Sequence, residues 1–237
     1  MSGVLNDEVY RGLLREEILR EVLNFEKGLV ERTRKAVVGI AAGGGYGSGS
    51  HIGEGYILTN CHVTGRSRRV QIEWPINKGR EKLVSAGDVI FNRPDYDLSV
   101  VRDRDARNHN RPRLYIKPEE VVEQGTKVCV LGSPLTLFMT CTFGHITATH
   151  RELDYYGVER GSLMTSVFFQ TDAAINPGNS GGACVDYEGD LIGVPSAGYD
   201  GADNIGFVIK INSIIEFIRE AEKQKNLEIA LLRAMVV

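Results

Sequence analysis

Apolar residues near the start of the chain recur at close to a helical period. They are Leu5, Val9, Leu13, Ile18, Val22, Phe25 and Leu29, within a stretch in which proline and glycine are nearly absent. Acidic residues also stand four positions before basic ones, an orientation that favours a helix, as in Glu16 with Arg20. The pattern predicts a long amphipathic helix over residues 1–35. We favour a helix packed on its own domain over one that associates with other copies.

From residue 36 to about 208 the pattern changes to short runs rich in Val, Ile, Thr, Tyr and Phe, separated by clusters of Gly, Pro, Asn and Asp. Examples are Ala36–Ala41, Gly55–Asn60, Arg69–Trp74, Leu98–Arg102, Lys127–Leu131, Ser166–Thr171, Ala183–Val185, Leu191–Pro195 and Gly206–Ile209. Intervening helices are too scarce for a doubly wound sheet, so the pattern predicts an all-β sandwich or antiparallel barrels. We place this domain at residues 36–211.

A second helical pattern begins at Asn212 and runs to about Lys223. Its apolar face consists of Ile214, Ile215, Phe217 and Ile218. An apolar-rich tail follows, and we treat residues 212–237 as a third unit. The two terminal units are the elements through which copies of the chain could form a homo-oligomer, and the sequence leaves that open.

Charge and apolar content limit the partners. The chain has 28 basic and 31 acidic residues, too even a balance for a protein that binds by neutralising phosphates, so nucleic acid is not expected as a partner. No stretch resembles the apolar core of a secretory signal or reaches the ~20 apolar residues of a membrane span. We therefore expect no membrane partner and a cytoplasmic or otherwise intracellular location.

The cysteines are Cys61, Cys129, Cys141 and Cys184, and they contain no C-x-x-C pair, which argues against structural zinc. We interpret them as free thiols in a reducing compartment. A bridge between Cys129 and Cys141 stays open, because two strands of one sheet could bring them together. No metal ion and no other cofactor is expected.

The segment T-D-A-A-I-N-P-G-N-S-G-G at residues 171–182 predicts a tight turn around Ser180. Gly178 and the glycines after Ser180 permit positive φ and allow a substrate carbonyl to approach main-chain N–H groups. Acyl transfer by a serine requires such donors and a nearby base. The natural donors are the N–H groups of Gly178 and Ser180, and residues Gly178, Asn179 and Ser180 form the candidate oxyanion hole. The alternative is a glycine-rich hairpin with a serine at its tip.

A base and an orienting carboxylate are available elsewhere in the sequence. His62 emerges at a polar turn where a predicted strand ends. Asp97 immediately precedes an apolar strand, so its side chain can be buried beside His62 and fix the imidazole tautomer. Asp95 follows Pro94 and is interpreted as a solvated turn residue. The predicted catalytic residues are therefore His62, Asp97 and Ser180.

Three motifs, in this order, resemble those of the HtrA/Deg branch of trypsin-like serine proteases. They are Y-I-L-T-N-C-H-V at 56–63, D-L-S-V-V at 97–101 and the serine segment at 171–182. The resemblance covers about residues 36–218 and implies two six-stranded antiparallel barrels with the His62, Asp97 and Ser180 triad between them. It implies a serine endopeptidase that acts on protein or peptide substrates. We expect the protease domain alone, without the PDZ domain that members usually carry.

The resemblance also implies which residues line the primary specificity pocket. They are Ala174, Ser196, Ala197, Gly198 and Ile205, and no carboxylate stands at the Ala174 position to hold Lys or Arg. A small or medium aliphatic residue is therefore expected before the cleaved bond. The competing hypothesis is a catalytically silent protease-fold module for peptide binding or scaffolding. A viral or phage processing protease would share the predicted chemistry.

Overall fold

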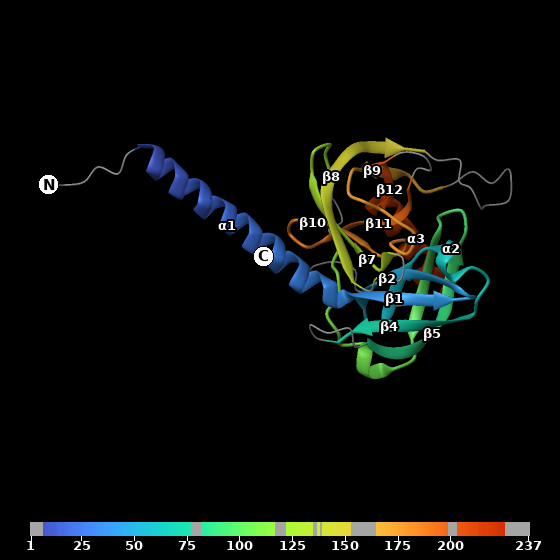
Figure 1. Ribbon diagram of the computed structural model, residues 1–237. Coiled ribbons are helices and arrows are strands. Elements are labelled where there is room, and N and C mark those ends of the chain that lie inside the picture. The colour runs from blue at the N-terminus through green and yellow to red at the C-terminus, as the bar shows by residue number, and fades with distance from the viewer. Residues whose placement is uncertain are drawn as a thin grey trace, which may run out of the picture.

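The computed structural model describes residues 7–76, 82–116, 122–134, 137, 139–152, 165–198 and 203–225 (Figure 1). The helices are α1 (Asp7–Thr33), α2 (Cys61–Thr64) and α3 (Ile211–Lys225), with short 3₁₀ turns at Arg34–Ala36 and Ala106–Asn108. The strands are β1 (Val37–Ala42), β2 (Gly45–Gly53), β3 (Tyr56–Thr59), β4 (Arg69–Pro75), β5 (Lys82–Arg93), β6 (Leu98–Asp103), β7 (Lys127–Gly132), β8 (Thr140–Arg151), β9 (Phe168–Thr171), β10 (Ala183–Asp186), β11 (Leu191–Gly198) and β12 (Gly206–Lys210).

The strands form two closed antiparallel barrels of six strands each. The first has the order β1, β2, β3, β6, β5, β4. The second has the order β10, β11, β12, β9, β8, β7. In Figure 1 the first barrel carries the blue and green strands and the second the yellow and orange ones. The expected all-β fold of two six-stranded barrels is confirmed.

Three strands, β2, β5 and β8, are not among the runs named from the sequence. β2 has the sequence G-Y-G-S-G-S-H-I-G, and glycine and serine carry little of the β-branched and aromatic signal that marks a strand. β5 is long and mostly half-buried, without a regular alternation of buried and exposed positions. All three strands are held by pairing with strands that the sequence does predict.

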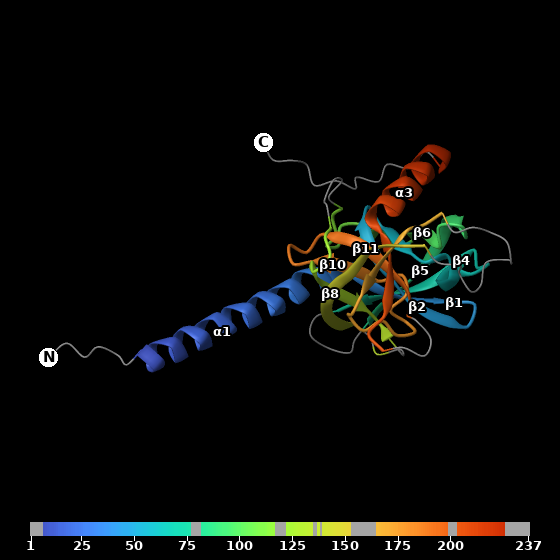
Figure 2. The same cartoon turned by 90° about the horizontal axis from the view of Figure 1, so that it is seen from above.

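Helix α3 packs against both barrels and closes the apolar core between them (Figure 2). Its buried residues include Ile214, Phe217 and Ile218, and the ring of Phe217 lies 5.3 Å from that of Phe91 on β5. The C-terminal helix expected from the sequence is therefore part of the domain core. The predicted tail from residue 226 lies outside the described residues.

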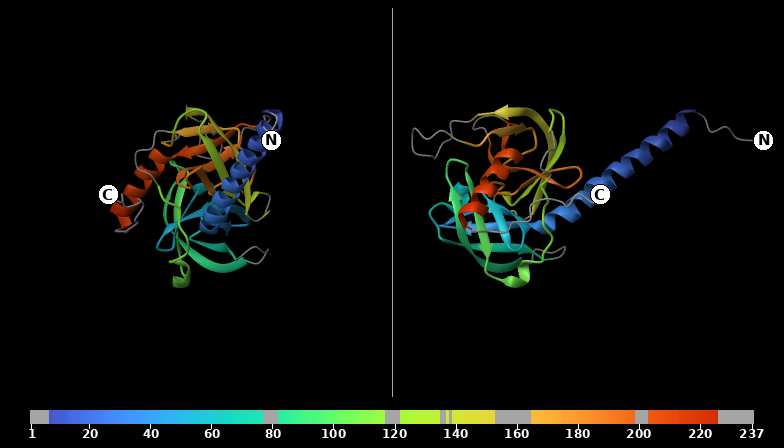
Figure 3. Two further views of the ribbon diagram at one scale, coloured as in Figure 1. Left: turned by 90° about the vertical axis from the view of Figure 1, so that its left-hand side faces the viewer. Right: turned by 180° about the vertical axis from the view of Figure 1, so that it is seen from behind.

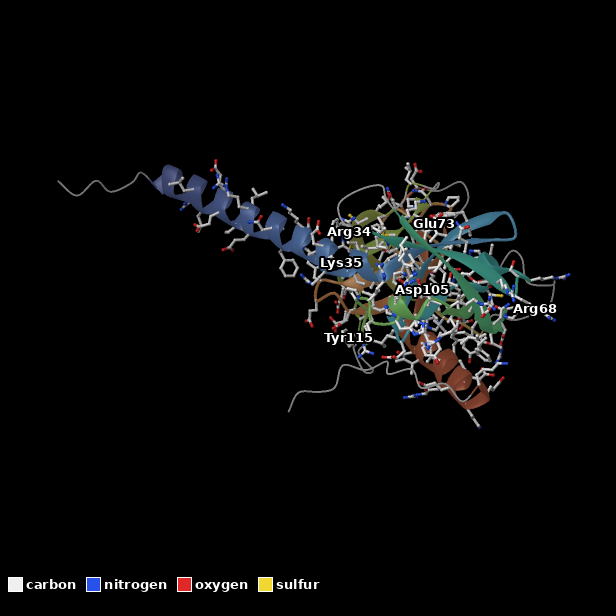
Figure 4. All side chains as sticks on the ribbon, turned by 90° about the horizontal axis from the view of Figure 1, so that it is seen from below. Arg34, Lys35, Arg68, Glu73, Asp105 and Tyr115 are labelled. Carbon is white, nitrogen blue, oxygen red and sulfur yellow. The ribbon has the colours of Figure 1, made fainter. Side chains whose placement is uncertain are left out.

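Helix α1 contacts the barrels only through its last turns and otherwise points away from them, as the right-hand view of Figure 3 shows. Leu29 is fully buried, and the ring of Phe25 stacks on that of Tyr187 at 5.6 Å. The Tyr187 hydroxyl donates a 2.7 Å hydrogen bond to Glu26. Figure 4 labels Arg34 and Lys35 where α1 meets the first barrel.

The sequence led us to favour a helix packed on its own domain, but the part of α1 before its last turns is not packed on the barrels. Leu14, Ile18 and Val22 are 45%, 52% and 44% exposed. A helical period shows which residues share a face, but it cannot show what covers that face. A helix packed on its own domain therefore describes the last turns of α1 only.

The cysteines are free thiols in the structure, as expected. Leu131 on β7 stands opposite Cys141 on β8, and Cys129 stands opposite Phe143. Cys129 and Cys141 are therefore diagonal neighbours on one face of the sheet, and they are not bridged.

Candidate active site

His62 lies on α2, a single helical turn directly after β3, and Asp97 lies in the turn between β5 and β6. The two segments are adjacent because β3 and β6 are paired strands of the first barrel. The backbone carbonyl of Asp97 accepts hydrogen bonds from the Cys61 N–H at 3.1 Å and from the Asn60 side-chain amide at 2.9 Å. These bonds fix the position of α2 relative to the aspartate.

The Asp97 carboxylate faces the imidazole of His62 directly. Nδ1 of His62 lies 2.9 Å from both carboxylate oxygens, and the His62 backbone N–H donates to Oδ1 at 3.0 Å. The Asp97 side chain is 3% exposed, whereas that of His62 is 33% exposed. A buried carboxylate thus holds an imidazole that is open to solvent, the burial order that the sequence predicts for these two residues.

Ser180 lies in the turn between β9 and β10, and glycines allow this turn to pass close to the first barrel. A Cβ on Gly181, which has φ of 82°, would stand 2.2 Å from the Ser48 carbonyl oxygen and 2.2 Å from the Thr59 hydroxyl. Only glycine fits there. The Ser180 carbonyl accepts the Ser48 N–H at 2.8 Å, which ties the turn to β2.

The side chains of Ser180 and Asp97 are connected through Ser196 on β11. The Ser180 hydroxyl donates to the Ser196 carbonyl at 3.0 Å, and the Ser196 hydroxyl donates to Oδ2 of Asp97 at 2.7 Å. Ser196 occupies this place because β11 has a register shift between Pro195 and Ala197, which turns the extra residue toward the first barrel. The sequence suggested Ser196 only as a pocket residue.

The candidate oxyanion hole is a turn in which the N–H groups have different partners. The Asn179 N–H donates to the Asn176 carbonyl at 2.9 Å, inside the turn. Within the described part of the chain, no acceptor is recorded for the N–H groups of Gly178 and Ser180. Gly178 has φ of 102°. The geometry therefore leaves two main-chain donors for a ligand, and Asn179 supports the turn rather than adding a third.

The residues expected to line the primary pocket lie on the second barrel beside Ser180. Gly198 stands opposite Gly206 in the pairing of β11 with β12, and a Cβ on Gly198 would meet the Ile175 carbonyl at 3.3 Å. Ala197 and Ile205 are half-buried, while Ala174 is exposed and its carbonyl accepts the Thr142 hydroxyl at 3.0 Å. Residues 199–202, between these segments, are outside the described part.

Cys61, next to His62, is not a second nucleophile. Burial, and then the Asp97 carboxylate, raise the pKa of its thiol to about 11. A thiol with this pKa stays protonated at neutral pH, and the thiolate is the reactive form.

Comparison with known families agrees with this geometry. The model of the trypsin-like peptidase domain matches residues 47–194, more than half of the chain. The chain is an HtrA-like member of the trypsin-like peptidase family. The matched span includes His62, Asp97 and Ser180. The resemblance on which the sequence analysis relied is confirmed.

Known HtrA proteins are similar over most of the barrel region. A probable periplasmic serine endoprotease, DegP-like, of Buchnera aphidicola is 35% identical over 164 residues, covering 68% of this chain and 32% of the relative. The mitochondrial serine protease HTRA2 of Bos taurus is 32% identical over 219 residues, covering 87% of this chain and 45% of the relative. This HtrA-like chain thus spans less than half the length of these relatives. A crystal structure of a serine endoprotease from Yersinia pestis superposes with a TM-score of 0.68 at 29% identity, covering 83% of this chain and 66% of that one.

One expectation from the sequence was wrong. The predicted cytoplasmic or otherwise intracellular location is contradicted by the DegP-like relative, which is periplasmic. Among the described helices of this HtrA-like chain, none is both long enough and apolar enough to cross a membrane.

Proposed function

We propose that this chain is a serine endopeptidase that hydrolyses peptide bonds of protein substrates through the triad His62, Asp97 and Ser180. The observation that carries the proposal is the contact of Nδ1 of His62 with both oxygens of buried Asp97 at 2.9 Å. In the neutral ring this contact places the proton on Nδ1, so Nε2 is the basic nitrogen. A base held in that tautomer is what a serine nucleophile requires.

The proposed reaction begins with Ser180. Its hydroxyl turns from the Ser196 carbonyl toward His62, gives its proton to Nε2, and Oγ attacks the substrate carbonyl. The N–H groups of Gly178 and Ser180 then donate to the oxyanion of the tetrahedral intermediate. Protonated His62 passes its proton to the leaving amine, and water repeats the sequence to release the acyl group. Asp97 stabilises the imidazolium throughout.

The family and the site both support hydrolysis over a catalytically silent module. A module that only bound peptides would need neither the buried carboxylate beside His62 nor unengaged N–H groups beside a serine. The periplasmic relative supports a location outside the cytoplasm.

Cleavage of an unfolded protein tests this proposal. We expect the full chain to cut reduced, denatured casein and to generate new N-termini, detected by mass spectrometry after amine labelling. The same preparation carrying His62→Ala is the control for contaminating proteases. Binding of casein without new termini would support the scaffolding alternative instead.

The pocket residues predict which residue precedes the cut. Among the described residues of this region, Ala174, Ala197 and Ile205 present no charge to a substrate side chain. We expect cleavage after Val, Ala, Ile or Leu to exceed cleavage after Lys or Arg by at least about tenfold, because an unpaired buried cation is costly. A peptide-library profile measures this preference. A profile dominated by Lys and Arg would contradict the assignment of the pocket.

We further propose that a second copy of the chain packs along the free part of α1. Leu14, Ile18, Val22 and Phe25 follow one another at spacings of four or three residues, so they form one stripe. At its inner end Leu29 is fully buried and the ring of Phe25 stacks on that of Tyr187, although Phe25 is still 46% exposed; the residues further out are exposed. The stripe is thus an uncovered continuation of a core face.

Charge along the stripe indicates the orientation of that copy. Arg11 and Arg15 lie three residues before Leu14 and Ile18 on one flank, and Glu17 and Glu21 lie three residues after them on the other. In a parallel pair the basic flank of one helix faces the acidic flank of the other, whereas an antiparallel pair opposes like charges. Charge complementarity therefore favours a parallel pair.

Sedimentation of a stripe variant tests the association. We expect Leu14→Gln, Ile18→Gln and Val22→Gln together to weaken self-association at least about tenfold, because the apolar contact is lost. The matched control carries Glu16→Gln, Arg20→Gln and Lys27→Gln on the opposite face and should sediment as the wild type does. A monomeric wild type at micromolar concentration would refute this contact.

A further inference from the structure

Ser48 on β2 contacts the serine turn at two points. Its backbone N–H donates to the Ser180 carbonyl at 2.8 Å, and its hydroxyl donates to the Gly178 carbonyl at 2.7 Å. Ser48 is fully buried, and its hydroxyl oxygen also accepts the Ser133 N–H at 2.9 Å. One hydroxyl of the first barrel therefore joins the serine turn to the end of β7 in the second barrel.

The two bonds at Gly178 and Asn179 fix the peptide unit between these residues at both ends. Its carbonyl accepts from Ser48, and its N–H donates to the Asn176 carbonyl at 2.9 Å. Glycine rotates more freely than any other residue, so a turn that contains Gly178 needs such restraints to keep one conformation. The direction of the Gly178 N–H relative to this peptide unit depends on the φ and ψ torsions of Gly178.

The surroundings leave little room for Ser48 or the turn to move elsewhere. A Cβ on Gly132, at the end of β7, would stand 2.8 Å from Oδ1 of Asn179 and 3.1 Å from the Ser48 hydroxyl. The Ser48 carbonyl is also engaged, because it accepts the Thr59 hydroxyl at 2.6 Å. Ser48 is thus held in place by its own strand and by its neighbours in both barrels.

We propose that Ser48 is a positioning residue that keeps the Gly178 N–H directed into the oxyanion hole. This inference rests on the proposed peptidase function of Ser180. Ser48 touches no reacting atom, and it acts through Gly178. Because the oxyanion is absent from the bound substrate and develops only after Oγ attacks, loss of the Ser48 hydroxyl affects turnover and leaves substrate binding nearly unchanged.

The kinetic variant is Ser48→Ala, compared with Ser50→Ala. Ser50 lies on the same strand and is also fully buried, but its hydroxyl has no hydrogen-bond partner among the described residues. Loss of one oxyanion donor costs about 10²–10³ in kcat, so misplacement of one is expected to cost about 10-fold to 100-fold. We expect this loss in Ser48→Ala, with KM within about threefold of wild type and Ser50→Ala near wild type.

A peptide boronic acid gives a readout that a general loss of stability does not move. The boron accepts Oγ of Ser180 and becomes a tetrahedral anion, so its inhibition constant reports the oxyanion hole. We expect this constant to rise in Ser48→Ala by the same factor by which kcat/KM falls. If Ser48→Ala does not fold, Ser48→Cys decides, because its weaker S–H donor should give a smaller loss with the same pattern.

The outcomes distinguish failure of the proposed role of Ser48 from failure of the proposed peptidase function. A Ser48 variant with the kcat and boronate affinity of wild type overturns the inference while the peptidase function stands. Equal losses in Ser48→Ala and Ser50→Ala, or a rise in KM alone, also overturn it. A wild-type chain that neither cleaves peptide nor binds the boronate refutes the proposed function, and the role of Ser48 falls with it.

Discussion

Replacement of Ser180 by alanine is expected to lower kcat for peptide hydrolysis by about 10⁶-fold, the loss typical of a triad nucleophile. The physical reason is that acyl transfer needs an oxygen that can lose its proton to His62 and bond the substrate carbonyl. Alanine offers neither. His62→Ala should cost about as much, because the triad works as a unit, and the double variant should be no worse than either single one. Single-turnover cleavage of an aliphatic peptide measures these rates.

The Ser180→Ala protein should remain folded, which separates chemistry from stability. The recorded hydrogen bond of the Ser180 hydroxyl is to the Ser196 carbonyl, so its loss should change the free energy of unfolding by about 1 kcal/mol or less. Urea unfolding provides the control. Hydrolysis within tenfold of wild type by a folded Ser180→Ala protein would eliminate Ser180 as the nucleophile.

Asp97→Asn is expected to lower kcat by about 10⁴-fold, as when the aspartate of comparable triads is replaced by asparagine. An amide can donate to Nδ1 of His62, which stabilises the tautomer with the proton on Nε2. That tautomer cannot accept the proton of Ser180. The loss should therefore appear in kcat, with the imidazole still in place.

Asp95→Asn is the matched control for the loss of kcat expected in Asp97→Asn. Asp95 lies two residues before Asp97, and its carboxylate pairs with Arg93 at 2.6 Å, a contact that lowers the pKa of Asp95. The pair is partly exposed, so Asp95→Asn should stay within about threefold of wild-type kcat. Equal losses in both variants would mean that the turn between β5 and β6, rather than the Asp97 carboxylate, matters.

The parts of the fold and site that the sequence predicts are those with a local signal. The apolar strands and α3 can be predicted from residue type and period. The ordered motifs around His62, Asp97 and Ser180 carry the family resemblance, which implies the two barrels. The choice of Asp97 over Asp95 depended on one argument, that Asp97 precedes a buried strand. In the structure Asp97 is buried against His62, whereas Asp95 pairs with Arg93 and both of their side chains are partly exposed.

Other features depend on contacts between distant segments and have no local signal. The hydrogen bond from Ser196 to Asp97 depends on a register shift in β11, and residue types alone do not predict where such a shift occurs. Ser48 lies on β2, whose glycines and serines give no strand signal, yet its hydroxyl reaches across to Gly178. The direction of α1 is likewise set by a few contacts at its base, such as Phe25 with Tyr187.

Covalent labelling tests the central claim most directly. A fluorophosphonate phosphonylates a serine hydroxyl only where a base activates it: Oγ bonds to phosphorus, fluoride leaves, and the serine proton passes to the base. We expect stoichiometric labelling of the full chain, with the adduct mapped by peptide mass spectrometry to Ser180, and loss of labelling in both Ser180→Ala and His62→Ala. An adduct on another residue, or equal labelling of the Ser180→Ala protein, would contradict the proposed triad.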